Sequence, residues 1–170
     1  MQKLFYLFLV FIGISSVQAQ AHWTVQSLIP EVVSIRVPTT NIVFGITQDN
    51  YPPETFPHQY PATSPQGGVL PVQVFSNAEG AWSLTLEIPG FEQRGSGLHR
   101  IEANQIMYRV NNGVWLRANG SSQIIYNGSG KTTNWQEIRI QFALELTGKE
   151  TAGSYAINAT VAALQDNSGF

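Results

Sequence analysis

Cysteine is absent from the 170 residues, which excludes disulfide scaffolds, thiolate metal sites and cysteine nucleophiles. Charged residues make up only 12% of the chain, which is about half of the roughly 25% usual in globular proteins. The net charge is −2 and no run of Lys or Arg occurs, so nothing predicts a nucleic-acid partner. Asp49 and Asp166 are the only aspartates, which argues against an Asp-rich calcium loop.

The first residues have the three-part composition of a secretory signal peptide. Met1–Lys3 carries one positive charge, an apolar run of about eleven residues follows, and small residues end at Ala19. The run is too short for a bilayer span of about twenty residues. We therefore expect a signal peptide over 1–19, with cleavage after Ala19 or after Ala21, and a secreted or cell-surface protein without a membrane span. The alternative is a retained N-terminal anchor.

The remaining residues, 20–170, predict a single all-β domain. Apolar residues alternate with polar ones over short stretches, as in strands with one buried face. The clearest alternating stretches are 33–37, 72–74, 82–88, 138–146 and 155–163. No segment has a helical period with caps. The pattern favours an antiparallel β-sandwich of about 8–10 strands, Ig-like or jelly-roll-like, with a closed barrel as the alternative.

Turn residues separate these stretches. Asn-Gly pairs tolerate the positive φ that tight hairpins require. Asn112-Gly113 and Asn127-Gly128 are therefore the predicted hairpin tips.

A proline-rich segment over 47–68 interrupts the strand pattern, and it is predicted to be one long extended loop. Tyr51, Phe56 and Tyr60 lie among the prolines. One interpretation is a binding loop that presents aromatic faces to a ligand. The other is a loop that folds its aromatic side chains back over an open edge of the sandwich.

Two tryptophans are further candidates for ligand binding, because flat aromatic rings can stack on sugar rings. Trp115 follows a predicted hairpin tip, and Trp135 is out of phase with the apolar face of 138–146. Trp82 is in phase with Leu84 and Leu86 and is expected in the core. Packing against a neighbouring strand is the alternative role for Trp115 and Trp135.

No cluster of residues selects a catalytic chemistry. Gly128–Thr132 is similar to the end of a phosphate-binding loop, but Ile125 stands where that motif needs glycine. Gly95–Gly97 lacks the spacing of a serine-hydrolase elbow. The glutamates lie on polar strand faces or beside turns, so no two form a predicted acid–base pair. We therefore expect no catalytic residue, no cofactor and no enzymatic activity.

One metal site is conceivable from the sequence. If cleavage follows Ala21, His22 becomes the first residue, and its amino group and imidazole could hold copper. This would resemble the histidine brace of secreted copper proteins and lytic polysaccharide monooxygenases. The site would need a second imidazole, from His58 or His99. Otherwise His22 is an ordinary strand residue and no metal is expected.

Two stretches carry a resemblance to known domains. Val72–Asn77, followed by Gly80–Leu86 with its Trp-x-Leu sequence, resembles bacterial surface sandwich domains related to the WxL family. Ala152–Val161 is similar to the closing Gly-x-Tyr strand of those domains and of secreted pilin-like subunits. The second Trp-x-Leu motif of WxL proteins is missing. The resemblance implies a non-catalytic protein of the cell envelope or of an extracellular structure.

The N-terminal region, 22–37, holds two apolar runs separated by Pro30. Such a segment can pair within its own domain, or it can complete the sheet of a neighbouring copy. We therefore expect a structural or adhesive subunit that binds itself in an oligomer or filament. The alternative is a carbohydrate-binding module whose partner is a cell-envelope or extracellular polysaccharide.

Overall fold

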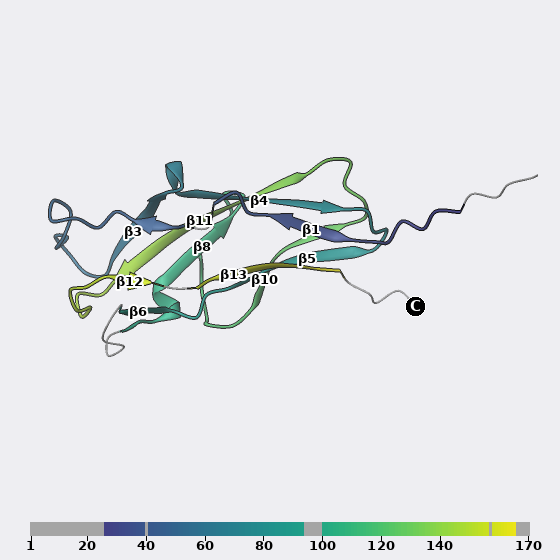
Figure 1. Ribbon diagram of the computed structural model, residues 1–170. Coiled ribbons are helices and arrows are strands. Elements are labelled where there is room, and N and C mark those ends of the chain that lie inside the picture. Colours follow the sequence, from purple (N-terminus) through teal and green to yellow (C-terminus); the bar gives the residue numbers. More distant parts are fainter. Residues whose placement is uncertain (1–25, 40, 94–99, 157, 166–170) are drawn as a thin grey trace, which may run out of the picture.

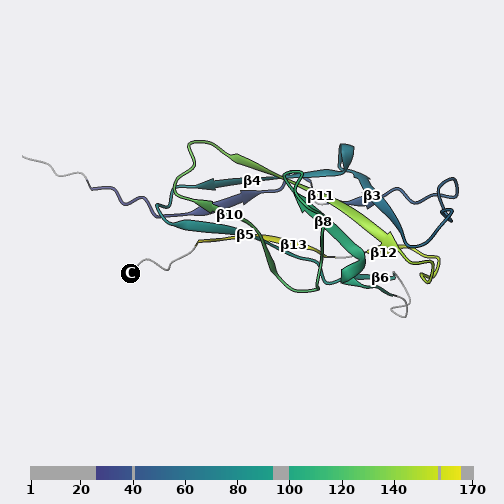
Figure 2. The same ribbon diagram turned by 180° about the vertical axis from the view of Figure 1, so that it is seen from behind.

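The computed structural model describes residues 26–39, 41–93, 100–156 and 158–165. Within these ranges the chain forms thirteen antiparallel strands and two short 3₁₀ turns, Gln66–Gly68 and Ala103–Gln105. The strands stack in two layers, as seen from both sides in Figures 1 and 2. The predicted antiparallel all-β sandwich is confirmed, although the described residues form thirteen strands where about 8–10 were expected, because four strands are only two residues long. The predicted signal peptide lies outside the described residues.

The first layer is built around one long strand, β11. The first half of β11 pairs with β4 and its second half pairs with β3, whereas its other edge pairs with β8. At the edges of this layer, β1 pairs with β4, β2 pairs with β3, and β9 pairs with β8. The strands of this layer are β1 (Val33–Arg36), β2 (Val43–Phe44), β3 (His58–Ser64), β4 (Val69–Ser76), β8 (Ile106–Val110), β9 (Leu116–Arg117) and β11 (Gln136–Leu146).

The second layer has β5 at its centre, between β10 and β13. Further along, β6 lies between β12 and β7. Thr160 of β13 pairs with Glu87 of β5, and Ala156 of β12 pairs with Glu92 of β6. The segment from β12 to β13 therefore runs antiparallel to the segment from β5 to β6, and the pairing register is nearly the same in both pairs of strands. The strands of this layer are β5 (Ala81–Glu87), β6 (Phe91–Gln93), β7 (Arg100–Ile101), β10 (Gln123–Ser129), β12 (Tyr155–Ala156) and β13 (Thr160–Gln165).

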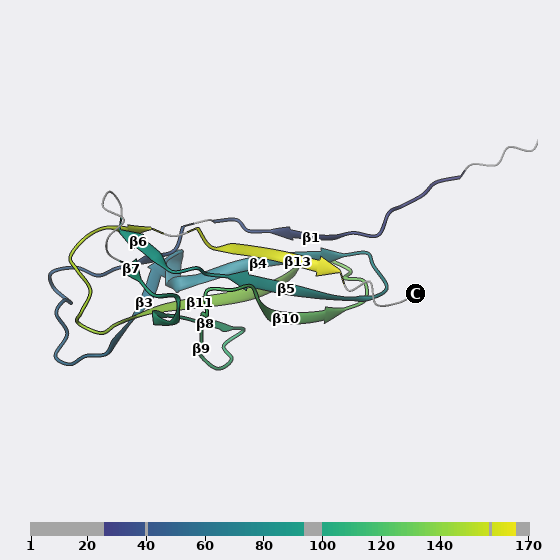
Figure 3. The same cartoon turned by 90° about the horizontal axis from the view of Figure 1, so that it is seen from below.

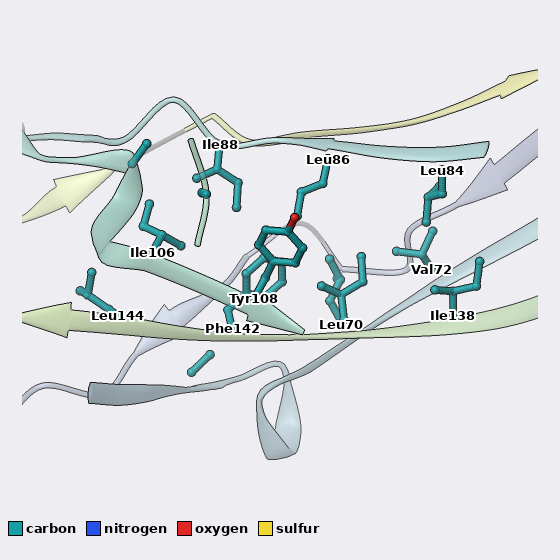
Figure 4. Close-up of a cluster of buried hydrophobic side chains, with 14 of the residues drawn as sticks. Leu70, Val72, Leu84, Leu86, Ile88, Ile106, Tyr108, Ile138, Phe142 and Leu144 are labelled. Carbon is teal, nitrogen blue, oxygen red and sulfur yellow. The ribbon is translucent and has the colours of Figure 1, made fainter. Parts of the chain in front are cut away.

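The core lies between the layers, and alternate residues of each strand enter it. In β4 the burial alternates residue by residue, and in β11 Ile138 and Ile140 are fully buried. Figure 4 shows side chains from β5 facing those from the first layer. Trp82 is buried, as its phase with Leu84 and Leu86 predicts. Every strand with strict alternation thus has one face in this core.

Two strand positions differ from the sequence predictions. The loop predicted over 47–68 is shorter, because His58–Ser64 forms β3, which pairs with both β11 and β2. The prolines of this segment mask the strand pattern, since proline is disfavoured inside sheets. The stretch predicted over 155–163 is divided into β12 and β13.

The two predicted hairpin tips have different outcomes. The tip at Asn112-Gly113 is confirmed, because Asn111 and Asn112 have positive φ and the Gly113 N–H bonds the carbonyl oxygen of Val110. The tip at Asn127-Gly128 is wrong, because both residues lie inside β10. Position 128 requires glycine because a Cβ atom at this position would lie 2.1 Å from the Trp82 ring.

Candidate functional site

Residues 26–32, here called the arm, precede β1 and run past the end of the sandwich (Figures 1 and 3). Leu28 is 93% exposed and Ile29 is 77% exposed. None of the arm residues lies in a strand. Apolar side chains at this level of exposure keep most of their hydration, and among the described residues Leu28 and Ile29 are the two neighbouring large apolar side chains with the greatest exposure.

The base of the arm is held by Asn77, at the end of β4. The Asn77 side chain accepts a hydrogen bond from the Val32 N–H (2.6 Å) and donates one to the Pro30 carbonyl oxygen (2.9 Å). Gln165, at the end of β13, donates a hydrogen bond to the Glu31 carboxylate (2.9 Å). These contacts fix where the arm leaves the body. Pro30 has no N–H to donate, so it favours the end of sheet pairing here.

On the side of the molecule that carries the arm, the edges of the two layers are in contact near the arm and leave cavities between them further along. Near the arm, β1 lies beside β13 (Figure 3). Further along, two adjoining cavities of about 570 Å³ and 450 Å³ lie between the layers. We call them together the edge groove. Its main apolar lining is Ile42, Phe44, Ile46, Phe91, Tyr155 and Val161.

The edge groove exposes part of the core. Its lining side chains pack on the buried cluster and are themselves only partly buried. Phe44 and Phe91 meet edge to face across the layers, with ring centroids 6.1 Å apart. Among the described residues, β2 is paired only with β3, and β12 only with β6. The edge therefore offers an apolar surface bordered by unpaired strand edges, which is the type of site that accepts an added strand.

The three aromatic residues predicted in the proline-rich segment lie together near one end of the groove. Tyr60 is only 5% exposed, and its hydroxyl donates a hydrogen bond to the Asn50 carbonyl oxygen (3.0 Å). Burial raises the pKa of this hydroxyl. Tyr51 and Phe56 meet edge to face at 6.1 Å, and Tyr51 lines the groove. Tyr60 therefore presents no free ring face to a ligand, whereas Tyr51 is 36% exposed and Phe56 is 39% exposed, so only one of the three side chains is folded into the core.

The two predicted tryptophan sites lie on the outer face of the first layer, apart from the groove. Trp135 is half-buried against Phe75, and the Arg36 guanidinium lies over its ring, 3.9 Å from the centroid. Trp115 is also half-buried, with the Arg109 guanidinium 4.7 Å from its ring. An arginine thus covers one ring face of each tryptophan.

The structure does not bring the two tryptophans together. Trp135 precedes the first residue of β11, whereas Arg109, beneath Trp115, pairs with Gln141 further along that strand. The Arg109 Nε also donates a hydrogen bond to the Gln141 side chain (2.7 Å). Five residues of β11 separate the two sites, so they do not form one continuous aromatic platform.

Several titratable groups have structural partners. Arg117 pairs with Glu145 at 2.8 Å. Burial alone would raise the pKa of Glu150, but hydrogen bonds from Thr147 and Gln105 outweigh burial and lower it. Within the described ranges no group of three or more acidic or histidine side chains could hold a metal ion. His58 meets Tyr60 edge to face, with ring centroids 4.8 Å apart, whereas His22 and His99 lie outside the described residues.

The groove residues were missed in the sequence predictions. Ile42–Ile46 is a short apolar run that only Gly45 interrupts, in the segment that contains β2. That run could have indicated a buried strand. It does not reveal that the opposite edge lies far enough away to leave a groove.

Comparison with protein-family models gives no match, and comparison with curated proteins gives none either. In the part of the chain that the structure describes, no helix is long and apolar enough to cross a membrane.

Proposed function

We propose that this protein is a non-catalytic, exported subunit of a cell-surface or extracellular structure, and that it assembles with copies of itself through its arm. One observation carries the proposal: Leu28 and Ile29 stand almost fully exposed on a segment whose base is fixed to the body. The resemblance to bacterial surface sandwich domains and pilin-like subunits supports the same role.

The energetics favour assembly by strand addition over simple contact of two side chains. Full burial of a Leu or Ile side chain contributes about 1.5–3 kcal/mol. Association costs roughly 4–15 kcal/mol in lost freedom of motion. Leu28 and Ile29 together therefore do not suffice. Strand addition supplies backbone hydrogen bonds along the arm as well, and each adds roughly 0.5–1.5 kcal/mol to the apolar contribution.

The test compares two double variants of the mature protein by light scattering and negative-stain microscopy. Leu28→Ser with Ile29→Ser removes the apolar side chains of the arm. Val114→Ser with Ile124→Ser removes two exposed apolar side chains elsewhere, on the β8–β9 connection and on β10, as the matched control. Assembly that is lost only in the arm variant supports the proposal. Equal assembly in both variants, or monomers throughout, refutes it.

A second candidate function is carbohydrate binding at Trp115. The observation that favours it is the proximity of a half-exposed indole, the Arg109 guanidinium and the Gln141 amide, which combine a ring surface with hydrogen-bonding groups. Binding of the protein to extracellular polysaccharide that is lost in Trp115→Ala, with the arm variant unaffected, would favour this function over assembly.

A further inference from the structure

We infer that the edge groove is the acceptor site for the arm of a second copy of this chain. This inference rests on the proposed function, because it assigns the partner surface for the same assembly. The first reason is chemical. The arm offers exposed Leu28 and Ile29, and the groove offers partly buried residues that pack on the core, such as Phe44 and Tyr155. Contact between the arm and the groove would remove apolar side chains of both surfaces from water.

The second reason is the form of the groove. It lies between the edges of two layers, where the described parts of β2 and β12 each have one ladder partner. An extended segment placed there can pair with a strand edge through its backbone while alternate side chains enter the core. Pro30 limits how far such pairing extends toward the body of the donor, so the pairing segment is the part of the arm before it.

The third reason is placement. The arm leaves at the end of the sandwich where β4 ends and β5 begins, held there by Asn77 (Figure 1). The groove opens along the other half of the molecule, where Tyr51 and Glu150 line it. Between the two, β1 lies beside β13. A donor surface at one end and an acceptor surface toward the other give head-to-tail contacts between copies.

Head-to-tail contacts of this kind are heterologous, so they close into a ring only if the rotation between subunits allows it. Otherwise they continue as an open filament. The inferred contact therefore accounts for a polymer rather than for a symmetric dimer. Each added copy brings a new groove for the next arm.

The absence of cysteine allows a direct test by disulfide trapping. One variant of the mature protein carries Ile29→Cys in the arm, and a second carries Val43→Cys. Val43 lines both cavities and is 50% exposed, so its replacement leaves the core intact. The control pairs the Ile29→Cys variant with Ile124→Cys, on β10, where the side chain is 62% exposed.

Mixed and oxidised, the arm and groove variants should yield at least about ten times more cross-linked heterodimer than the arm and control variants, since disulfides form only at close Cβ separations. Mass spectrometry of the joined peptides identifies the linked positions. A synthetic peptide of residues 22–32 should reduce the yield.

The outcomes separate this inference from the proposed function. Unmodified protein that polymerises, with equal cross-linking to the groove and control positions, overturns the acceptor assignment and leaves arm-driven assembly standing. Unmodified protein that stays monomeric overturns both. Selective cross-linking at Val43 supports both.

Discussion

Gly128 of β10 lies directly opposite Trp82 of β5, and the Trp82 indole occupies the space that a side chain at 128 would fill. A Cβ atom there would lie 2.1–2.7 Å from three ring atoms. The largest fully buried side chain of the core is thus accommodated by the loss of a side chain on the neighbouring strand. This pair also explains why a glycine stands in the interior of a strand.

Gly128→Ala should therefore lower the free energy of unfolding by about 1–3 kcal/mol, because the indole must move out of its position. Urea denaturation measures this change. The adjacent exposed residue gives a matched control, and Ser129→Ala should stay within about 0.5 kcal/mol of the unmodified protein. The loss should shrink when Trp82→Leu is also present, and equal losses in both backgrounds would contradict the account.

Asn77→Ala removes two side-chain hydrogen bonds to the base of the arm. We expect a loss of about 1–2 kcal/mol in stability and faster hydrogen exchange at the Val32 amide. Asn77→Asp is the control, since it keeps the acceptor for the Val32 N–H, loses the donor to Pro30 and places a carboxylate oxygen against the Pro30 carbonyl oxygen. Unchanged exchange at Val32 in the alanine variant would show that the Asn77 side chain does not anchor the arm.

Glu150 makes stability depend on pH. Its folded-state pKa is lowered, so the unfolded chain binds more protons and stability is lost as pH falls from the unfolded value, about 4.3, through the folded pKa. Glu150→Gln should cost about 1 kcal/mol at pH 7, where the charged carboxylate accepts its hydrogen bonds, and less at pH 3. Urea denaturation at both pH values checks this. The exposed Glu54→Gln should show neither effect, and an equal cost of Glu150→Gln at both pH values would contradict the charge argument.

Arg36 covers one face of Trp135 and thereby ties β1 to the outer face of the first layer. Arg36→Ala should lower stability by about 0.5–1 kcal/mol. Thermal unfolding measures the change. Arg139→Ala, at an exposed position of β11, is the control. Equal melting temperatures for the two variants would mean that the cation–π contact contributes nothing measurable.

The strict alternation along β5 and β11 was sufficient to predict two strands and their buried faces. Trp82, Ile138 and Leu146 are buried as their phase requires. Such strands are predictable because one face of each packs on the core over its whole length. The alternation of apolar and polar residues is therefore visible within the sequence of the strand itself.

Other features depend on partners distant in sequence. Asn127-Gly128 has the local signal of a turn, and only the contact with Trp82 explains its place in β10. Tyr60 lies among prolines, yet its segment forms the strand β3 because it pairs with β11 and β2. The edge groove arises from the separation of two layer edges, so no short stretch of sequence encodes it. The exposed arm could be suspected from Pro30 and its apolar neighbours alone.

The measurement that tests arm-driven assembly most directly is sedimentation velocity of the protein without its predicted signal peptide (residues 20–170, the mature protein) over a wide concentration range, beside a chain that begins at Val33. We predict a series of oligomers that grows with concentration for the mature protein and a single monomeric species for the shortened chain. A mature protein that sediments as a monomer at every concentration would contradict the account.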